Sequence, residues 1–448
     1  MRIPETPPAF GDLIAKYADR LPKLYNAQAV RDPSNRYLHW SQIKWRRPPP
    51  DHSHEEWWVT TKIARQATRR ELPFLDKANR PFWLAETGHL HQQLHRIDRD
   101  ASGRIEFPAD VPNPESRNRY LVSSLFEESI RSSQLEGAAT TRREAKDMLR
   151  TGRSPRNKHE RMIFNNYQGL SFIREIAGEE LTQEAVLELH RVLTDQTLDD
   201  ESCAGRFRTV QEPVTVVDER TGDALFEPPD AENLNERMQR LLSFANRREH
   251  DPFLHPVVQA ALLHFMIGYE HPFVDGNGRT ARALFYWLMV REGYWLMEYL
   301  SISSIIHRSP VQYARAYLFT ESDESDFTYF LDYHLRVILD AIKQLHRYLA
   351  RKSQEVIEIG GVLETAALAL NLNHRQAALA GHLLKHPQVR PTIASHQRSH
   401  KVSYQTARTD LLSLSNLGLL TVSKRGRSME FRLAPGFKEK LRQATPPE

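Results

Sequence analysis

The chain has 448 residues, of which 40% are hydrophobic and 26% are charged, and its formal net charge at pH 7 is +4. This length exceeds what one hydrophobic core usually serves, so two or three domains are expected. The single cysteine, Cys203, excludes an internal disulfide framework and a cysteine-cluster metal site.

No apolar run is long enough to form a membrane helix. The longest run spans residues 283–290, whereas a membrane span needs about 20 residues. The first residues also lack the apolar stretch of a signal peptide. These features predict a cytoplasmic location and no membrane partner.

Residues 1–110 are predicted to form an N-terminal arm followed by a helical region. Residues 1 to about 50 are rich in proline, arginine and scattered aromatic residues, which is typical of an irregular surface segment. Apolar side chains then recur with helical periodicity from residue 56 to residue 96. A stretch rich in helix breakers, residues 110–114, marks a domain boundary.

The second region, residues 111–355, is predicted to be mostly helical. Between residues 206 and 229 the pattern changes, and two short runs flank a turn-rich loop, which predicts a β-hairpin over 214–217 and 224–226. The periodicity of apolar residues predicts helices over 120–135, 157–175, 183–198, 232–246, 256–270, 279–292 and 327–352.

The third region, residues 360–448, combines three predicted helices (375–385, 391–400 and 403–417) with two strands (419–423 and 429–433). This order resembles a winged helix-turn-helix. From residue 385 onward there are 12 Lys and Arg against 4 Asp and Glu, so this module is basic while the rest of the chain is slightly acidic. DNA is therefore a candidate partner, although such modules also serve as protein-interaction or dimerisation domains. The candidate nucleic-acid contacts are Tyr404 and Arg408 on the third helix and Lys424, Arg425 and Arg427 on the wing.

Between the predicted helices 256–270 and 279–292 lies the stretch His-Pro-Phe-Val-Asp-Gly-Asn-Gly-Arg-Thr-Ala-Arg, residues 271–282. Its two glycines let the backbone approach a ligand, and the free N–H groups at the start of a helix attract an anion. Arg279 and Arg282 are three residues apart, so both guanidinium groups can face phosphate oxygens. Asp275 among these cations is a suitable ligand for Mg²⁺ that bridges phosphates. His271 is then placed to take a proton from an attacking hydroxyl.

Each of these residues taken alone has a simpler explanation. Gly-Asn-Gly is a common turn, His271 could be a buried structural histidine, and Arg279 and Arg282 could belong to a solvated face. Their joint occurrence in this order and spacing favours the phosphate-binding interpretation.

The stretch resembles the signature of the Fic family, His-Pro-Phe-x-(Asp/Glu)-Gly-Asn-Gly-Arg-x-x-Arg, and matches every specified position. The resemblance extends from about residue 120 to about residue 345. It implies a mainly α fold, with an all-helical Fic domain that carries a β-hairpin flap, followed by the winged helix-turn-helix. The flap, with Val214, Thr215 and Val216, would add a short strand to the target peptide.

The resemblance also implies a role for each residue of the motif. His271 would deprotonate the target hydroxyl, and Asp275 would hold Mg²⁺ on the α- and β-phosphates. Arg279 would contact the phosphates and Arg282 the γ-phosphate. The other residues of the implied ATP site are Gly276, Asn277, Gly278, Thr280, Ala281 and Tyr313. Many relatives carry two adjacent tyrosines at the last position, whereas this sequence has Gln312 followed by Tyr313.

A second motif lies upstream, at the end of the predicted helix 120–137. Ser132, Glu136 and Gly137 resemble the family's inhibitory-helix motif, (Ser/Thr)-x-x-x-Glu-(Gly/Asn). If Glu136 pairs with Arg282, this arginine cannot receive the γ-phosphate, and ATP would bind without productive geometry.

We therefore expect a protein adenylyltransferase that uses Mg²⁺ and transfers AMP from ATP to Ser, Thr or Tyr hydroxyls of proteins, including its own. We expect Glu136 to inhibit this activity. Its partners would be ATP and a target protein, and homodimerisation is compatible with the sequence. Two alternatives remain open. The same site could remove AMP from a modified protein, or the chain could be a DNA-binding regulator whose Fic domain senses nucleotide.

Overall fold

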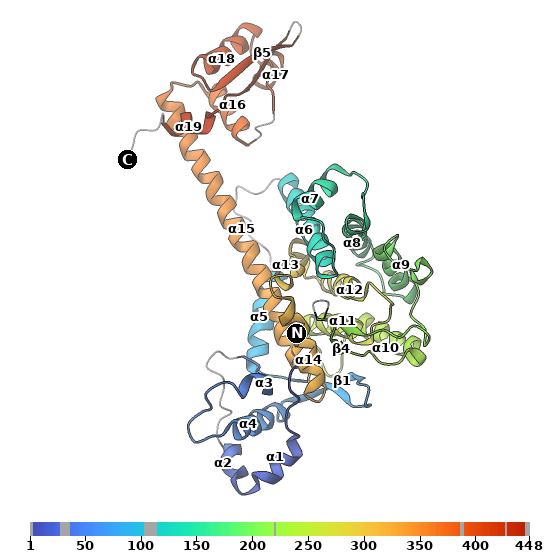
Figure 1. Ribbon diagram of the computed structural model, residues 1–448. Helices are drawn as coiled ribbons and strands as arrows, with labels where there is room; N and C mark the ends of the chain where they lie inside the picture. Colours follow the sequence, from blue (N-terminus) through green and yellow to red (C-terminus); the bar gives the residue numbers. More distant parts are fainter. Residues whose placement is uncertain are drawn as a thin grey trace. The chain divides into compact units, whose positions relative to one another are not determined.

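The computed structural model describes residues 3–26, 36–102, 114–218, 221–385, 389–425 and 428–443 (Figure 1). These residues form two compact units, the first containing those up to 102 and from 114 to 345, and the second those from 346 onward. The fold is mainly helical with small hairpins. Within the described ranges, no helix combines the length and the apolar character needed to cross a bilayer.

The N-terminal part of unit 1 is more ordered than its sequence suggests. The prediction of an irregular segment over residues 1–50 is wrong, because three short helices form there. These pack with buried Trp57 and Trp58 of α4 in one apolar cluster that also contains Leu13, Leu24 and Trp40. The elements of this part are α1 (Phe10–Lys16), η1 (Ala18–Arg20), α2 (Leu21–Asn26), α3 (Trp40–Ile43) and α4 (His54–Gln66).

The prediction of helix over residues 56–96 fails in the middle of that range. An antiparallel hairpin, β1 (Arg69–Leu75) and β2 (Pro81–Ala85), separates α4 from α5 (Gly88–Ala101). In β1, Leu72 and Phe74 are buried while the residues between and after them are exposed, which is the two-residue period of a strand. Asp76 closes the turn by accepting hydrogen bonds from the N–H groups of Ala78 and Arg80.

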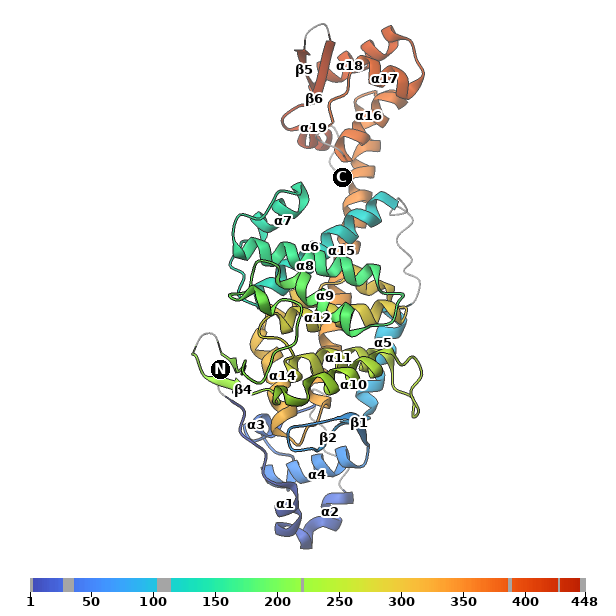
Figure 2. The same cartoon turned by 90° about the vertical axis from the view of Figure 1, so that its right-hand side faces the viewer.

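The remaining helices of unit 1 surround a buried pair, α11 (Pro256–Glu270) and α12 (Asn277–Arg291). Both helices are buried along almost their whole length, so they form the core (Figure 2). Around them lie α6 (Pro114–Leu135), α7 (Arg142–Thr151), α8 (Lys158–Glu175), α9 (Gln183–Thr194), α10 (Leu234–Asn246), α13 (Ile302–Ile306), α14 (Pro310–Ser322) and the first part of α15 (Thr328–Ala369). Short 3₁₀ turns occupy Glu201–Cys203, Ala231–Asn233 and Trp295–Tyr299. The hairpin predicted near 214–226 is present as β3 (Val216–Val217) and β4 (Ala224–Phe226).

Unit 2 has the predicted order of three helices and two strands. After the end of α15 come α16 (His374–Lys385), α17 (Ile393–His400), α18 (Tyr404–Asn416), β5 (Leu420–Arg425), β6 (Ser428–Leu433) and α19 (Phe437–Gln443). The strands pair antiparallel and share an apolar core with α16, α17 and α18. Asp410, buried on α18, accepts hydrogen bonds from Asn373 and Arg375 and contacts His396 at 3.3 Å. The identification of this unit as a winged helix-turn-helix remains a prediction.

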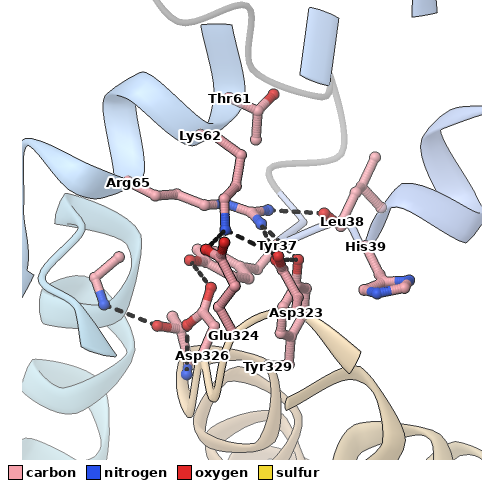
Figure 3. Close-up of polar contacts among 12 residues, drawn as sticks. Tyr37, Leu38, His39, Thr61, Lys62, Arg65, Asp323, Glu324, Asp326 and Tyr329 are labelled. Atoms are coloured by element: carbon pink, nitrogen blue, oxygen red, sulfur yellow. Dashed lines mark hydrogen bonds and ion pairs between the residues drawn. The ribbon is translucent and has the colours of Figure 1, made fainter. Parts of the chain in front are cut away.

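A buried cluster of charged and polar side chains fixes the N-terminal part of unit 1 to the loop between α14 and α15 (Figure 3). Lys62 Nζ of α4 contacts Asp323 Oδ1 at 2.9 Å and Glu324 Oε2 at 3.0 Å. Arg65 donates to the Tyr329 hydroxyl at 2.6 Å and to the carbonyl oxygen of Leu38 at 2.7 Å. Because Lys62, Arg65 and Asp323 are shielded from water, each of these charges depends on its partner much more than a surface ion does.

Replacing Lys62 with methionine is expected to destabilise the protein by about 3 kcal/mol, because the Asp323 carboxylate loses its nearest ammonium group while it stays buried. Thermal unfolding followed by circular dichroism measures the change. The matched control is Lys16→Met, which removes a surface ion pair with Glu55 and should barely shift the melting temperature. Equal shifts in the two variants would contradict a stabilising role of the buried cluster.

Candidate active site

The loop from α11 to α12 carries the motif of residues 271–282 and is held in a sharply turned conformation. His271 ends α11 with φ 49° and ψ 58°, and Gly276 precedes α12 with φ 85°, both in the left-handed region. The side chain of Asn277 bridges the loop, accepting from Phe273 N at 2.9 Å and donating to Phe273 O at 2.8 Å. Asn277 therefore fixes the loop with its side chain, and only its backbone N–H is left to face an anion.

His271 has the geometry of a general base. Its Nδ1 lies 3.0 Å from the carbonyl oxygen of Gly268, and since a carbonyl can only accept, Nδ1 carries the proton. The other nitrogen, Nε2, is then the basic atom of the ring. Burial lowers the pKa of His271 below its usual value, so the ring is neutral at pH 7. A neutral imidazole with a defined tautomer can accept a proton without first losing one.

Two residues that the sequence analysis did not single out support this loop. The ring of His190 in α9 stacks on Phe273 with a centroid distance of 3.8 Å, and His190 Nε2 donates to the carbonyl oxygen of Asp275 at 2.9 Å. Arg208 donates through Nε to the carbonyl oxygen of His271 at 2.8 Å. The sequence offers only a weak signal for His190, which is a polar residue on the apolar face of a helix, and none for Arg208.

The two arginines of the motif lie in different surroundings, although both are buried. Arg282 donates through Nε to Ser132 Oγ at 2.9 Å and through Nη2 to Glu136 Oε1 at 2.8 Å. Arg279 donates to the carbonyl oxygen of Leu193 at 2.6 Å, and Asp275 Oδ2 is 3.7 Å from its Nη2. Arg279 Nε and Nη2 are buried and have no hydrogen-bond partner among the described residues.

The carboxylate of Glu136 occupies the position beside the first turn of α12 at which an anion would bind. A Cβ atom built on Gly278 would clash with Glu136 Oε1, so the carboxylate lies directly against this glycine. The N–H groups of a first helical turn and the Arg282 guanidinium both attract negative charge. The Glu136 carboxylate therefore satisfies a site that also suits a phosphate.

A cavity of about 240 Å³ opens beside the loop. Of the predicted site residues, it is lined by Glu136, Val216, His271, Asp275, Gly276, Asn277, Gly278, Ala281 and Tyr313. Arg279, Thr280 and Arg282 are fully buried and do not line it. Val214 and Thr215 precede β3, and of the three predicted flap residues only Val216 lines the cavity. Gly137 is the residue with φ 88° that follows the end of α6. The roles of these residues remain predictions.

The candidate nucleic-acid residues belong to unit 2. Tyr404 and Arg408 lie exposed on one side of α18, where the Tyr404 side chain is 55% exposed. Lys424 and Arg425 end β5, and Arg427 lies outside the described residues.

Residues 180–289, which contain the loop, match a family model described as the Fic/DOC family. The chain therefore carries a Fic/DOC family domain. A protein named protein adenylyltransferase Fic from Nematostella vectensis is 28% identical over 227 residues, covering 48% of this chain and 49% of that protein. A protein of the same name from Drosophila melanogaster is 33% identical over 184 residues, covering 39% of this chain and 34% of that protein. The chain thus spans about half, or less, of the length of the curated relatives it matches.

Solved structures confirm the fold. A Fic family protein from Desulfovibrio desulfuricans G20 covers 78% of this chain and 96% of its own, with 18% identity and a TM-score of 0.54. The structure of Fic-1 from C. elegans covers 78% of this chain and 90% of its own, with 18% identity and a TM-score of 0.50. Unit 1 thus has a Fic fold, and the chain is a distant homologue of protein adenylyltransferases.

Proposed function

We propose that this chain is a protein adenylyltransferase that transfers AMP from ATP to Ser, Thr or Tyr hydroxyls of proteins, including its own. The observation that carries the proposal is the position of His271, a neutral base that lines a cavity beside the anion-attracting start of α12. The homology to protein adenylyltransferases supports the same reaction.

In the proposed reaction the phosphates of ATP lie against Gly276 and accept from the N–H groups of Asn277 and Gly278, the first residues of α12. The Gly276 N–H itself donates to Asp275 Oδ1. The target hydroxyl attacks the α-phosphorus in line with the bond to the β-phosphate. A new P–O bond forms with the target, the bond to the β-phosphate breaks, and pyrophosphate leaves with the electron pair. His271 Nε2 takes the hydroxyl proton. Val216 of the flap would align the target segment by backbone pairing.

The residues present fit one Mg²⁺ held mainly by substrate. The described residues contain no cluster of three or more His, Cys, Asp or Glu that could cage a metal. Asp275, which lines the cavity with a half-exposed carboxylate, would be the protein ligand. Mg²⁺ often binds through one carboxylate plus phosphate oxygens, and it would neutralise charge on the phosphates.

Glu136 would inhibit this reaction in the state described here. Its carboxylate holds Arg282 and lies against Gly278, so a γ-phosphate cannot take the same place. ATP would then bind with its phosphates displaced from the position that in-line attack requires.

Mass spectrometry of the full-length chain after incubation with ATP and Mg²⁺ tests the proposal. An added AMP on a hydroxyl residue of the chain, or on a protein supplied with it, supports adenylylation. Release of AMP from a previously modified protein, with no transfer from ATP, would instead favour the reverse reaction, in which Glu136 would orient a water molecule. If the chain neither transfers AMP from ATP nor releases AMP from a modified protein, both the adenylyltransferase function and the reverse reaction are refuted.

Unit 2 supports a second candidate function, binding of duplex DNA, because Tyr404 and Arg408 lie exposed at the start of α18. The chain would then be a DNA-binding regulator whose Fic domain senses nucleotide. Affinity for duplex DNA should fall steeply with salt, and Arg408→Ala should weaken binding and lower the slope of log affinity against log salt by about 1. Absence of binding at low salt would assign this unit to a protein partner.

A further inference from the structure

One face of α14 forms a wall of the active-site cavity. Tyr313, Tyr317 and Glu321, spaced four residues apart, all line it. Tyr313 lies at the phosphate end: burial raises the pKa of its hydroxyl, and the nearby Arg282 guanidinium opposes this rise. With a rise of 1.5 Å per residue, Glu321 lies about 12 Å further along the helix. Glu321 therefore lines the cavity at the end away from His271 and Gly278.

The walls near this end are largely apolar and come from several segments. The flap contributes Leu225 and Phe226, and α14 contributes Leu318. The β1–β2 turn reaches the same place, since Lys77 Nζ lies 4.6 Å from the centre of the Phe226 ring. Lys77 N also donates to the Tyr269 hydroxyl at 3.0 Å. A flat aromatic ligand fits such walls, with one polar group, Glu321, beside it.

The Glu321 carboxyl is available to a ligand. Among the described residues, no hydrogen bond or ion pair holds it. Burial raises its pKa to about 8, against the opposing effect of Lys77. The other titratable groups that face it, Tyr269 of α11 and Tyr317 of α14, have pKa values raised by burial and are neutral. At pH 7 Glu321 is therefore mostly a neutral acid, with one donor and one acceptor.

The loop that follows Glu321 is held in place by the buried cluster of Figure 3. Asp323 contacts Lys62, and the backbone N–H of Phe327 donates to the carbonyl oxygen of Trp83 at 2.8 Å. The N-terminal part of unit 1 thus fixes the end of α14 and supplies Lys77 beside the cavity. Its contacts give Glu321 a defined position, as recognition of a ligand edge requires.

We propose that Glu321 reads the nucleobase of the donor nucleotide, accepting a hydrogen bond from the 6-amino group of adenine and donating one to N1. This inference rests on the proposed nucleotide-binding function, and it assigns to Glu321 the selection of adenine over other nucleobases. Adenine offers a donor next to an acceptor on this edge, which a neutral carboxylic acid complements. An ionised carboxylate can only accept, so it would keep one bond to adenine and face N1 with a lone pair.

Binding of ATP to the full-length chain, measured by isothermal titration calorimetry, tests the proposal independently of AMP transfer. At pH 6.5, Glu321→Ala is expected to weaken ATP binding by about tenfold. Glu321→Gln should bind ATP about as tightly as wild type, because an amide also offers one donor and one acceptor. Unchanged ATP affinity in Glu321→Ala would overturn the proposal, as would failure of the wild-type chain to bind ATP.

The pH dependence of nucleotide affinity distinguishes recognition of the nucleobase by Glu321 from a purely structural role of this residue. In wild type the ATP affinity, taken relative to that of GTP, should fall between pH 6.5 and pH 9, because the carboxyl ionises near pH 8 and an ionised acid suits the N–H groups of guanine. In Glu321→Gln this ratio should not depend on pH. A pH dependence that persists in Glu321→Gln would refute the proposal. Glu321-dependent ATP binding without AMP transfer would uphold it and refute the adenylyltransferase function instead.

Discussion

Replacing His271 with alanine is expected to lower the rate of AMP transfer by about 10²- to 10⁴-fold, the usual contribution of a general base. The physical reason is the loss of Nε2, the atom that accepts the hydroxyl proton, while Nδ1 is occupied by the carbonyl of Gly268. Transfer of radiolabelled AMP, measured at saturating ATP, checks this result. The variant should melt at the wild-type temperature and bind ATP with similar affinity.

The control for this prediction is His91→Ala, which removes an exposed histidine of α5 and should leave the rate unchanged. The pH profile provides a second check. Because burial lowers the pKa of His271, its neutral form predominates at pH 7, and the rate should be lost only as the pH falls through this lowered value. Transfer by His271→Ala at the wild-type rate would show that another group is the base.

Replacing Glu136 with glycine is expected to raise AMP transfer by about ten- to a hundredfold, corresponding to the loss of one charge-assisted hydrogen bond. Without this carboxylate, Arg282 keeps its hydrogen bonds to Ser132 and gains a free Nη2 donor for the γ-phosphate. The space against Gly278 also opens to a phosphate. The same labelling assay, with wild type and variant side by side, measures the gain.

Two variants control this second prediction. Glu127 lies on α6, which ends just before Glu136, but it pairs with Arg142 and does not line the cavity, so Glu127→Ala should not activate. Glu136→Gln should activate only partly, because an amide oxygen still accepts from Arg282 but carries no charge. Equal labelling by wild type and Glu136→Gly would show that Glu136 is not inhibitory.

Local signals in the sequence predicted much of the fold. The apolar periodicity of α8, α9, α11 and α12 predicted these helices within a few residues of their observed ends. Helices of this length carry their own signal, because an apolar face as in α9, or an apolar surface on nearly every side as in α11 and α12, must be buried whatever it packs against. The short helices of residues 10–43 lack such a pattern. They are stabilised by packing on Trp57 and Trp58, which no window of a few residues contains.

The candidate site divides in the same way. The stretch of residues 271–282 determined by itself the loop, the candidate base His271 and the start of α12, because all of these lie within one helix–turn–helix segment. It did not determine which side chains face the cavity. Asn277 bonds to its own loop, Arg279 is fully buried, and His190 supports the loop from α9.

What the sequence by itself determined is therefore the chemistry available, a histidine base beside an anion-attracting helix start. Only the tertiary structure decided which distant residues surround this histidine and this helix start. Glu136 meets Arg282 across 146 positions of the chain, and Lys62 meets Asp323 across 261. Such contacts depend on how helices pack, and packing is set by the whole core rather than by local preference. The position of Glu321 at the far end of the cavity is a consequence of the same packing.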